Sequence, residues 1–206
     1  MSEQEMNEEQ GEEAQTPTRK RPRPGERRLQ ILQTLAGMLE QPGAERVTTA
    51  ALAARIGVSE AALYRHFASK AQMFEGLIDF IEQSIMGLIR QVTDREPQGP
   101  QQASRIVALL VQFGEKNPGM TRVMTGDALV HEHARLQERV NLLFDKIEAQ
   151  LRQSLRSSDG PTPTVDAQVT ASLLVAFLMG RLQRYARSGF KRLPSEQLGD
   201  CLSRLV

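Results

Sequence analysis

The chain has little of several residue types that mark other classes of protein. Its 206 residues include one cysteine, no tryptophan and two tyrosines, and aromatic residues make up 4% of the total. The single cysteine, Cys201, excludes an internal disulfide and suits a reducing compartment. No apolar run approaches the roughly 20 residues that span a bilayer, and the acidic, polar start does not resemble a signal peptide. We therefore expect a cytoplasmic protein with no membrane partner.

Residues for catalysis or metal binding are equally sparse. His131 and His133 are separated by one residue, so on a helix their side chains would point about 200° apart and could not hold one ion together. The sequence has no phosphate-binding glycine loop and no nucleophile paired with a base, and Cys201 has no histidine nearby. It therefore predicts no enzyme, no metal site and no cofactor.

Charge is distributed unevenly along the chain, although the net charge is only +1. Residues 1–18 hold six glutamates and no lysine or arginine, which leaves 26 basic and 19 acidic residues in the remainder. A positive body is attracted to phosphate polymers. The basic cluster that follows the acidic segment is either a solvated tail or an arm that lies along DNA: Arg19, Lys20, Arg21, Arg23, Arg27 and Arg28.

Helical periodicity extends through most of the sequence, and no stretch alternates with the period of two that marks a strand. The first 24 residues are rich in Glu, Gln and Pro and are predicted to be a disordered tail. We expect an all-α fold of about nine helices, over residues 25–41, 49–56, 60–66, 70–93, 101–116, a short helix from Pro118, 128–156, 165–188 and a short helix from Pro194.

Caps and apolar stripes support these boundaries. Ser69 with Gln72 forms a capping box before the helix at 70–93, while Asn117 and Asp127 are expected to cap the helices that follow them. Pro118 suits a first helical turn. The apolar stripe of the first helix is Leu29, Leu32, Leu35, Ala36 and Leu39.

The stretch from Thr48 to Lys70, TTAALAARIGVSEAALYRHFASK, predicts a helix-turn-helix followed by the start of another helix. Gly57 supplies the tight turn, where a side chain would obstruct the chain. Six apolar positions can close a small three-helix core: Leu52, Ala53, Ile56, Val58, Leu63 and Phe67.

This arrangement leaves one side of the helix at 60–66 free to enter a DNA major groove. Arg65 can read guanine or bind phosphate, and Glu60 can accept from cytosine N4 while repelling phosphate. Lys70 sits in the first turn of the next helix, where free N–H groups already favour an anion. The predicted DNA-binding residues are Thr48, Thr49, Ser59, Glu60, Ala61, Ala62, Tyr64, Arg65, His66 and Lys70.

The segment resembles the DNA-binding domain of the TetR family, whose pattern T-x-x-x-L-A-x-x-x-G-V-S-x-x-x-L-Y-x-H-F-x-S-K it matches. The resemblance implies a helix-turn-helix head at residues 25–70 and a helical regulatory and dimerisation domain at 71–206. It also implies a homodimer that pairs through helices at about 165–188 and 195–206 and reads palindromic double-stranded DNA, with half-sites roughly 34 Å apart.

Four later segments resemble one branch of that family, the nucleoid occlusion factors, over about residues 27–195. They are VSEAALYRHFASKAQMFEGLIDFIEQSI, FGEKNPGMTRVMTGDALVHEHARLQERVNLLF, KIEAQLRQSLR and SGFKRLPSE. The branch implies a cytoplasmic, nucleoid-associated protein that binds specific chromosomal sites, with several dimers clustering on a site. There it antagonises assembly of the tubulin-like protein FtsZ, so that the septum does not close over DNA.

The same resemblance places the FtsZ-binding surface at Phe80, Leu109, Lys116 and Asn117. Two positions depart from the branch: Leu88 stands where an arginine is expected, and Gln112 where a glycine is expected. Lys116 in place of an arginine keeps the charge but loses bidentate geometry. Phe80 also lies off the main apolar stripe of its helix, which fits either a peptide groove or ordinary core packing.

A second function remains open from the sequence, that of a ligand-responsive TetR-type transcriptional repressor. Such proteins release DNA when a small molecule enters the helical bundle, in pockets often lined by aromatic residues. The low aromatic content and the aliphatic helix at 101–116 favour a filled bundle, so no small-molecule ligand is expected. Binding to FtsZ would separate the two functions.

Overall fold

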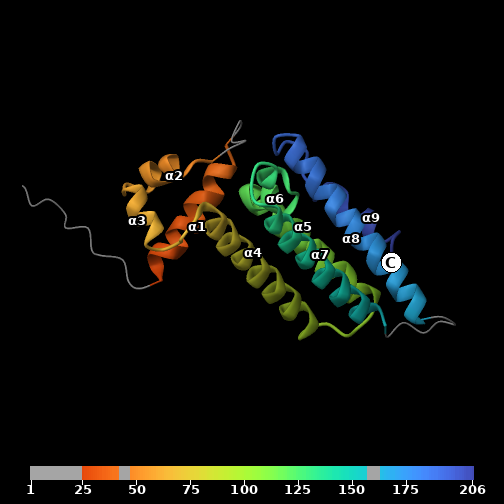
Figure 1. Ribbon diagram of the computed structural model, residues 1–206. Helices are drawn as coiled ribbons and strands as arrows, with labels where there is room; N and C mark the ends of the chain where they lie inside the picture. Colours follow the sequence, from red (N-terminus) through yellow and green to blue (C-terminus); the bar gives the residue numbers. More distant parts are fainter. Residues whose placement is uncertain (1–24, 42–46, 157–162) are drawn as a thin grey trace, which may run out of the picture.

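The computed structural model describes residues 25–41, 47–156 and 163–206, and every regular element in these ranges is helical. The predicted tail at 1–24 lies outside the described residues. A small head of three helices sits at one end of a long helical body, and α4 runs from the head along that body (Figure 1). The predicted all-α fold is confirmed, with nine α-helices and one 3₁₀ turn in the described ranges.

The head comprises α1 (Glu26–Leu39), α2 (Thr49–Ile56) and α3 (Glu60–Tyr64). Thr48 Oγ1 accepts the Ala51 N–H at 3.1 Å and so caps α2, and Ser59 Oγ caps α3 by accepting the Ala62 N–H at 3.3 Å. Between them Gly57 adopts the left-handed conformation at φ 77° that the turn requires. The predicted helix-turn-helix therefore forms where the capping signals place it.

The core of the head also follows the prediction, with one exception on α1. Of the six predicted apolar residues, five are buried and Val58 is half-buried. Leu29, however, is 41% exposed, and Ile31 is fully buried in its place. The predicted stripe was wrong at its first residue, because α1 packs against both the head and the body and buries a wider face.

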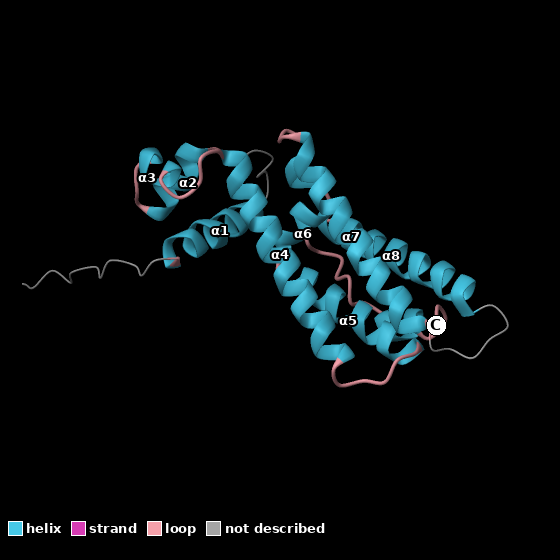
Figure 2. Cartoon of the chain, turned by 60° about the horizontal axis from the view of Figure 1, so that its bottom comes forward, coloured by secondary structure: helices cyan, strands magenta, loops and turns pink. Residues whose placement is uncertain are grey.

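The body consists of α4 (Lys70–Thr93), α5 (Pro100–Lys116), α6 (Pro118–Met124), α7 (Ala134–Leu155), α8 (Pro163–Arg187) and α9 (Leu198–Leu202). The long helices lie side by side, α7 packing on α8 and α4 packing on both α5 and α7 (Figure 2). The helix α5 is central, and its inner residues are fully buried, namely Ala103, Ile106, Val107, Leu110 and Val111.

Two predicted caps are wrong. Asp127 does not start a helix running to 156; it begins a 3₁₀ turn (Asp127–Leu129), and its carboxylate accepts from Gln183 Nε2 at 3.2 Å. The helix α7 starts at Ala134, where His133 Nδ1 accepts the Arg135 N–H at 3.3 Å. Asn117 precedes α6 but donates its amide to the Phe113 carbonyl at 2.7 Å, so it closes the end of α5 instead.

The head is joined to the body by close contact between α1 and α6. Arg122 Nη1 donates to the Leu39 carbonyl at 3.3 Å, near the end of α1. A Cβ added at Gly119 would lie 1.9 Å from the Ala36 carbonyl oxygen, so the two backbones touch at this glycine. The Tyr185 hydroxyl of α8 donates to the Glu115 carbonyl at 3.0 Å, and burial raises the pKa of this hydroxyl.

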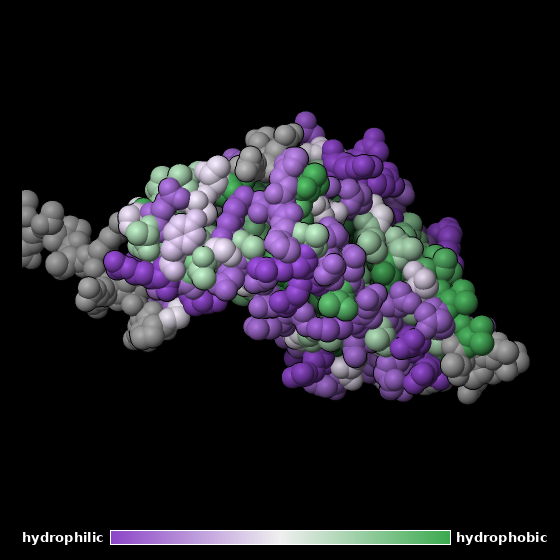
Figure 3. Space-filling view, viewed as in Figure 1, coloured by the Kyte–Doolittle hydropathy of each residue, from purple (hydrophilic) through white to green (hydrophobic). Residues whose placement is uncertain are grey.

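The helix α8 corrects one expectation from the sequence. Within its stretch Val165–Arg187, an 18-residue window has a mean hydropathy of 1.4, so the helix is long and apolar enough to cross a membrane by length and composition alone. The sequence shows no continuous apolar run across this stretch, because the charged Asp166 and Arg181 and several uncharged polar residues interrupt it. One side of α8 lies in the core, while hydrophobic residues gather on the surface along its N-terminal half (Figure 3).

Candidate nucleic-acid interface

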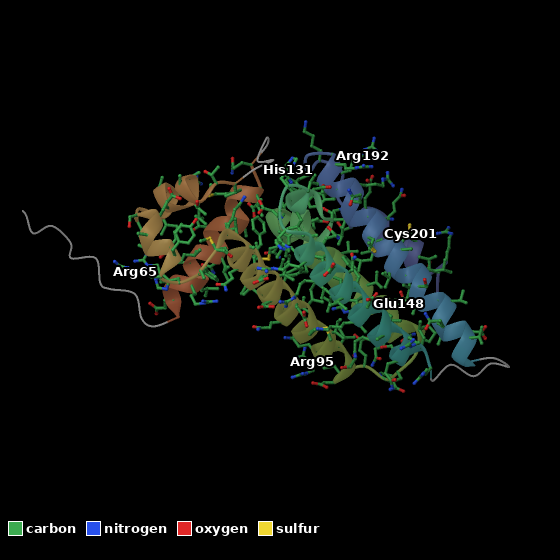
Figure 4. The ribbon with its side chains drawn as sticks, viewed as in Figure 1. Arg65, Arg95, His131, Glu148, Arg192 and Cys201 are labelled. Carbon is green, nitrogen blue, oxygen red and sulfur yellow. The ribbon has the colours of Figure 1, made fainter. Side chains whose placement is uncertain are left out.

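The α3 helix presents the side that the sequence predicted. Glu60, Ala61 and Arg65 are exposed, Tyr64 is 45% exposed, and Leu63 on the opposite side is fully buried. Arg65 points outward from the head, away from the helical body (Figure 4). Ala62 and His66 are half-buried beside this face, with His66 just beyond the end of α3. The geometry thus offers a short, narrow helix whose outer side is polar.

The three predicted hydroxyl residues are tied into the scaffold of this surface. Thr48 and Ser59 use their oxygens as helix caps, and both remain exposed. Thr49 Oγ1 donates to Glu60 Oε2 at 2.6 Å, a bond that links the start of α2 to the start of α3. Glu60 therefore has a protein partner, which sequence reasoning missed because nothing in the local spacing indicates it.

We expect the Glu60→Ala protein to bind DNA more tightly on average and less selectively. The carboxylate repels phosphate everywhere but accepts a hydrogen bond only from some bases, so its removal raises affinity while discrimination falls. Binding curves for a matched and a scrambled duplex would measure this as a smaller ratio of dissociation constants. Equal weakening on both duplexes would instead assign Glu60 to the Thr49 bond alone.

The end of α3 is held by Arg28 of α1. Its Nη1 donates to the His66 carbonyl at 2.5 Å, and its guanidinium lies 4.1 Å from the centre of the Phe67 ring. From the sequence, Arg28 belonged to a basic cluster that either contacts DNA or is solvated. Here it fixes the chain leaving α3, while Arg27 donates to Gln30 Oε1 at 2.7 Å. Residues 19–24 of that cluster lie outside the described residues.

Lys70, at the first turn of α4, is not free. Its ammonium forms an ion pair with Glu132, which lies in the loop before α7, and it sits 5.7 Å from the centre of the Phe74 ring. The lysine side chain is 25% exposed and that of Glu132 is 11% exposed. The sequence placed Lys70 correctly beside the head but did not identify Glu132, 62 positions further along the chain.

The second predicted surface lies on α4 and α5, which pack against each other. Phe80 and Leu109 are half-buried and packed against the core, so Phe80 is neither free nor a full core residue. Lys116 is exposed at the end of α5, and Asn117 is half-buried next to it. Of the two positions that depart from the branch, Leu88 is half-buried and Gln112 is exposed.

The other candidate sites show weaker signs of metal or ligand binding. Within the described ranges no group of three or more His, Cys, Asp or Glu side chains is arranged to hold a metal ion. Cys201 is half-buried, with Arg181 Nη2 3.0 Å from its sulfur. A pocket among α6, α7 and α8 has a volume of about 50 Å³, whereas ligand sites usually need roughly 300–1,000 Å³. A wider cleft of about 490 Å³, between α5 and α9, is open to solvent.

Comparison with known proteins identifies related domains in both parts of the chain. Residues 31–77 match the bacterial regulatory proteins of the tetR family, and residues 101–205 match the SlmA-like, tetracyclin repressor-like C-terminal domain. The chain is 52% identical over 174 residues to the nucleoid occlusion factor SlmA of Photobacterium profundum, which covers 82% of this chain and 89% of the relative. It is 50% identical over 178 residues to SlmA of Vibrio cholerae, with 84% and 91% covered.

Solved structures share the fold at low sequence identity. A TetR transcriptional regulator from Legionella pneumophila superimposes with a TM-score of 0.70 at 13% identity, over 88% of this chain and 97% of that one. The regulator FadR of Bacillus subtilis, solved with stearoyl-CoA, superimposes with a TM-score of 0.66 at 12% identity, over 86% of this chain and 97% of that one. Together the matches confirm a TetR-type fold and a soluble cytoplasmic DNA-binding regulator rather than an enzyme. The chain belongs to the SlmA family of nucleoid occlusion factors.

Proposed function

We propose that this protein acts as a homodimer that binds a palindromic chromosomal site and, while bound there, antagonises FtsZ assembly. The single observation that carries the proposal is the pairing of an exposed, polar α3 with a body that matches the SlmA-like domain over residues 101–205. Such a protein would associate with the nucleoid and keep the septum from closing over it. Several dimers are expected to cluster on one site.

The DNA-binding part of the proposal is assigned to the ten residues named above, which lie in the head and at the start of α4. Arg65 and Glu60 are proposed to read base edges, because both are exposed on the outer side of α3. Tyr64 and His66 flank them and are proposed to contact the sugar-phosphate backbone. Footprinting at moderate ionic strength tests DNA binding, and the expected result is a protected palindrome.

The proposed dimer is supported by an exposed apolar stripe on α8. Val165 is 61% exposed, Val169 is 54% exposed and Leu173 is 52% exposed, at spacings that place them on one side of the helix. Ala176 and Gly180 continue that side, and nothing lies within 4 Å of a Cβ placed at Gly180. Small and apolar residues in a row suit close packing against the same helix of a second copy, as in a four-helix interface.

We expect Leu173→Asp to convert the protein to monomers, because each copy of a symmetric interface would bury one carboxylate without a partner. Operator affinity should fall at least about tenfold, since the two half-sites would no longer be bound by one particle. Sedimentation velocity and duplex titration measure the two effects. The matched control is Leu142→Asp, an equally exposed leucine (55%) on α7, which should stay dimeric. A dimeric Leu173→Asp protein would contradict the assignment.

The proposed FtsZ-binding surface is assigned to Phe80, Leu109, Lys116 and Asn117. Phe80 and Leu109 supply half-buried apolar area, and the exposed Lys116 supplies a positive charge at the end of α5. This combination suits a peptide with apolar anchors and acidic residues. Fluorescence anisotropy of a labelled FtsZ C-terminal tail peptide tests it: Lys116→Ala should weaken binding, and the exposed Lys191→Ala on the α8–α9 turn should not. Absence of peptide binding by the parent protein, with DNA release by a small molecule, would favour the repressor alternative.

A further inference from the structure

We infer that Glu132 is a positioning residue for DNA binding: it holds Lys70 and competes with the DNA phosphate for that ammonium. The inference rests on the proposed DNA-binding function and deepens it by naming how the body regulates the head. Its basis is the ion pair between Lys70 at the start of α4 and Glu132 in the loop before α7.

The place of Lys70 makes the competition direct. Ser69 caps α4 by accepting the Gln72 N–H at 3.2 Å, and Gln72 Oε1 accepts the Ala68 N–H at 2.8 Å, so two hydrogen bonds hold the turn between head and body. Lys70 is the first residue of α4, at the helix end that favours anions. A phosphate approaching this end would meet a lysine whose ammonium is already occupied by the Glu132 carboxylate.

Glu132 is well placed to act as such a competitor. Its side chain is only 11% exposed, and its backbone N–H donates to the Leu129 carbonyl at 3.0 Å, which holds the loop against the 3₁₀ turn. If Lys70 turned to a phosphate, this nearly buried carboxylate would lose the ammonium of its ion pair. Desolvating a charge without a partner is unfavourable, so the pair opposes DNA binding in the free protein.

The pair is also the first of four that join α4 to the segment 132–146. Glu75 pairs with Arg135 at 2.7 Å, and Asp79–Arg139 and Glu82–Lys146 continue along the same two helices. In the first pair the cation is on α4, while in the other three it is on α7. Phe80 lies next to Asp79 within this series. Loss of the first pair on DNA would therefore remove one of the four ion pairs that hold α4, the helix whose later turns carry the proposed partner surface.

The test is a double-mutant cycle on DNA affinity, measured by anisotropy with a duplex that the parent protein protects. Glu132→Gln should raise affinity about fivefold, the upper range for a partly exposed ion pair. In a Lys70→Gln background the same change should have no effect, because Glu132 acts through Lys70. The control, Glu82→Gln, removes the same charge at the far end of the series and should leave DNA affinity unchanged.

The salt dependence gives a readout that a merely structural role would not move. Lys70→Gln should lower the slope of log K against log salt by about 0.9, the value for one phosphate contact. Glu132→Asp keeps the carboxylate and, unlike Glu132→Gln, should bind DNA with nearly the affinity of the parent protein. An unchanged affinity for Glu132→Gln, or an equal gain in both backgrounds, would overturn the inference. A parent protein that protects no duplex would instead refute the proposed function itself, so the two failures are distinguishable.

Discussion

Replacing Gly119 with alanine is expected to lower the free energy of unfolding by about 2–3 kcal/mol, the cost of overpacking a close contact. The new Cβ would lie 1.9 Å from the Ala36 carbonyl oxygen and 2.8 Å from its carbon, and both atoms belong to the backbone of α1. A flexible side chain could move aside, but a helix backbone cannot do so without shifting the helix. Either α6 leaves α1 or the head tilts relative to the body. Urea unfolding followed by circular dichroism measures the loss.

The control for this substitution is Gly87→Ala in the middle of α4. Gly87 is exposed and has no atom within 4 Å of an added Cβ, so alanine should raise the unfolding free energy by about 0.5–1 kcal/mol through helix propensity. Equal stability of the Gly119→Ala protein and its parent would mean that α1 and α6 are not in contact in solution.

Replacing Arg65 with alanine is expected to remove about 1–3 kcal/mol of specific DNA binding, roughly a fivefold to 150-fold loss of affinity. Arg65 is exposed on the outer side of the head, just beyond the end of α3, and has no carboxylate paired with it in the described residues. A guanidinium in this position can donate two hydrogen bonds to guanine O6 and N7. Titration of matched duplexes measures the loss.

A set of single-base changes in the duplex decides what Arg65 contacts. If it reads a guanine, the Arg65→Ala protein should no longer distinguish the duplex altered at that one position. If it binds phosphate, affinity should fall by the same factor on every duplex, together with a lower salt slope. No change in affinity on any duplex would remove α3 from the DNA interface.

Sequence reasoning succeeded where the signals are local. Ser69 caps α4 as predicted, because a hydroxyl at a cap needs only its own following N–H groups. Gly57 takes the left-handed conformation for the same reason. The boundaries of α4, Lys70–Thr93, coincide with the predicted 70–93 because its cap and its long apolar stripe agree.

The errors and omissions arise where the structure depends on contacts between distant parts of the sequence. Leu29 was misplaced because α1 packs against two different parts of the chain, which a single stripe cannot describe. Asp127 failed as a cap because a distant residue, Gln183, binds its carboxylate. The pairing of Lys70 with Glu132, like that of Arg28 with the His66 carbonyl, joins residues far apart in sequence. Spacing within one helix cannot reveal such partners.

The candidate DNA surface was therefore predictable in outline but not in its connections. The exposed side of α3 follows from the helix-turn-helix spacing, whereas the bond from Thr49 to Glu60 depends on how α2 crosses α3. The partner surface came from the resemblance, with Phe80 also indicated by its position off the apolar stripe, and its burial could not be judged from sequence. Phe80 illustrates this, since a half-buried phenylalanine is compatible with core packing and with a contact site.

The most direct test of the central claim is the amount of FtsZ polymer that sediments in the presence of this protein with and without its DNA. Three reactions are compared: protein alone, protein with a palindromic duplex that it protects, and protein with a scrambled duplex of equal length. The account predicts the largest loss of polymer with the palindromic duplex, because DNA-bound dimers act on FtsZ. An equal amount of polymer in all three reactions, matching that of FtsZ alone, would contradict it.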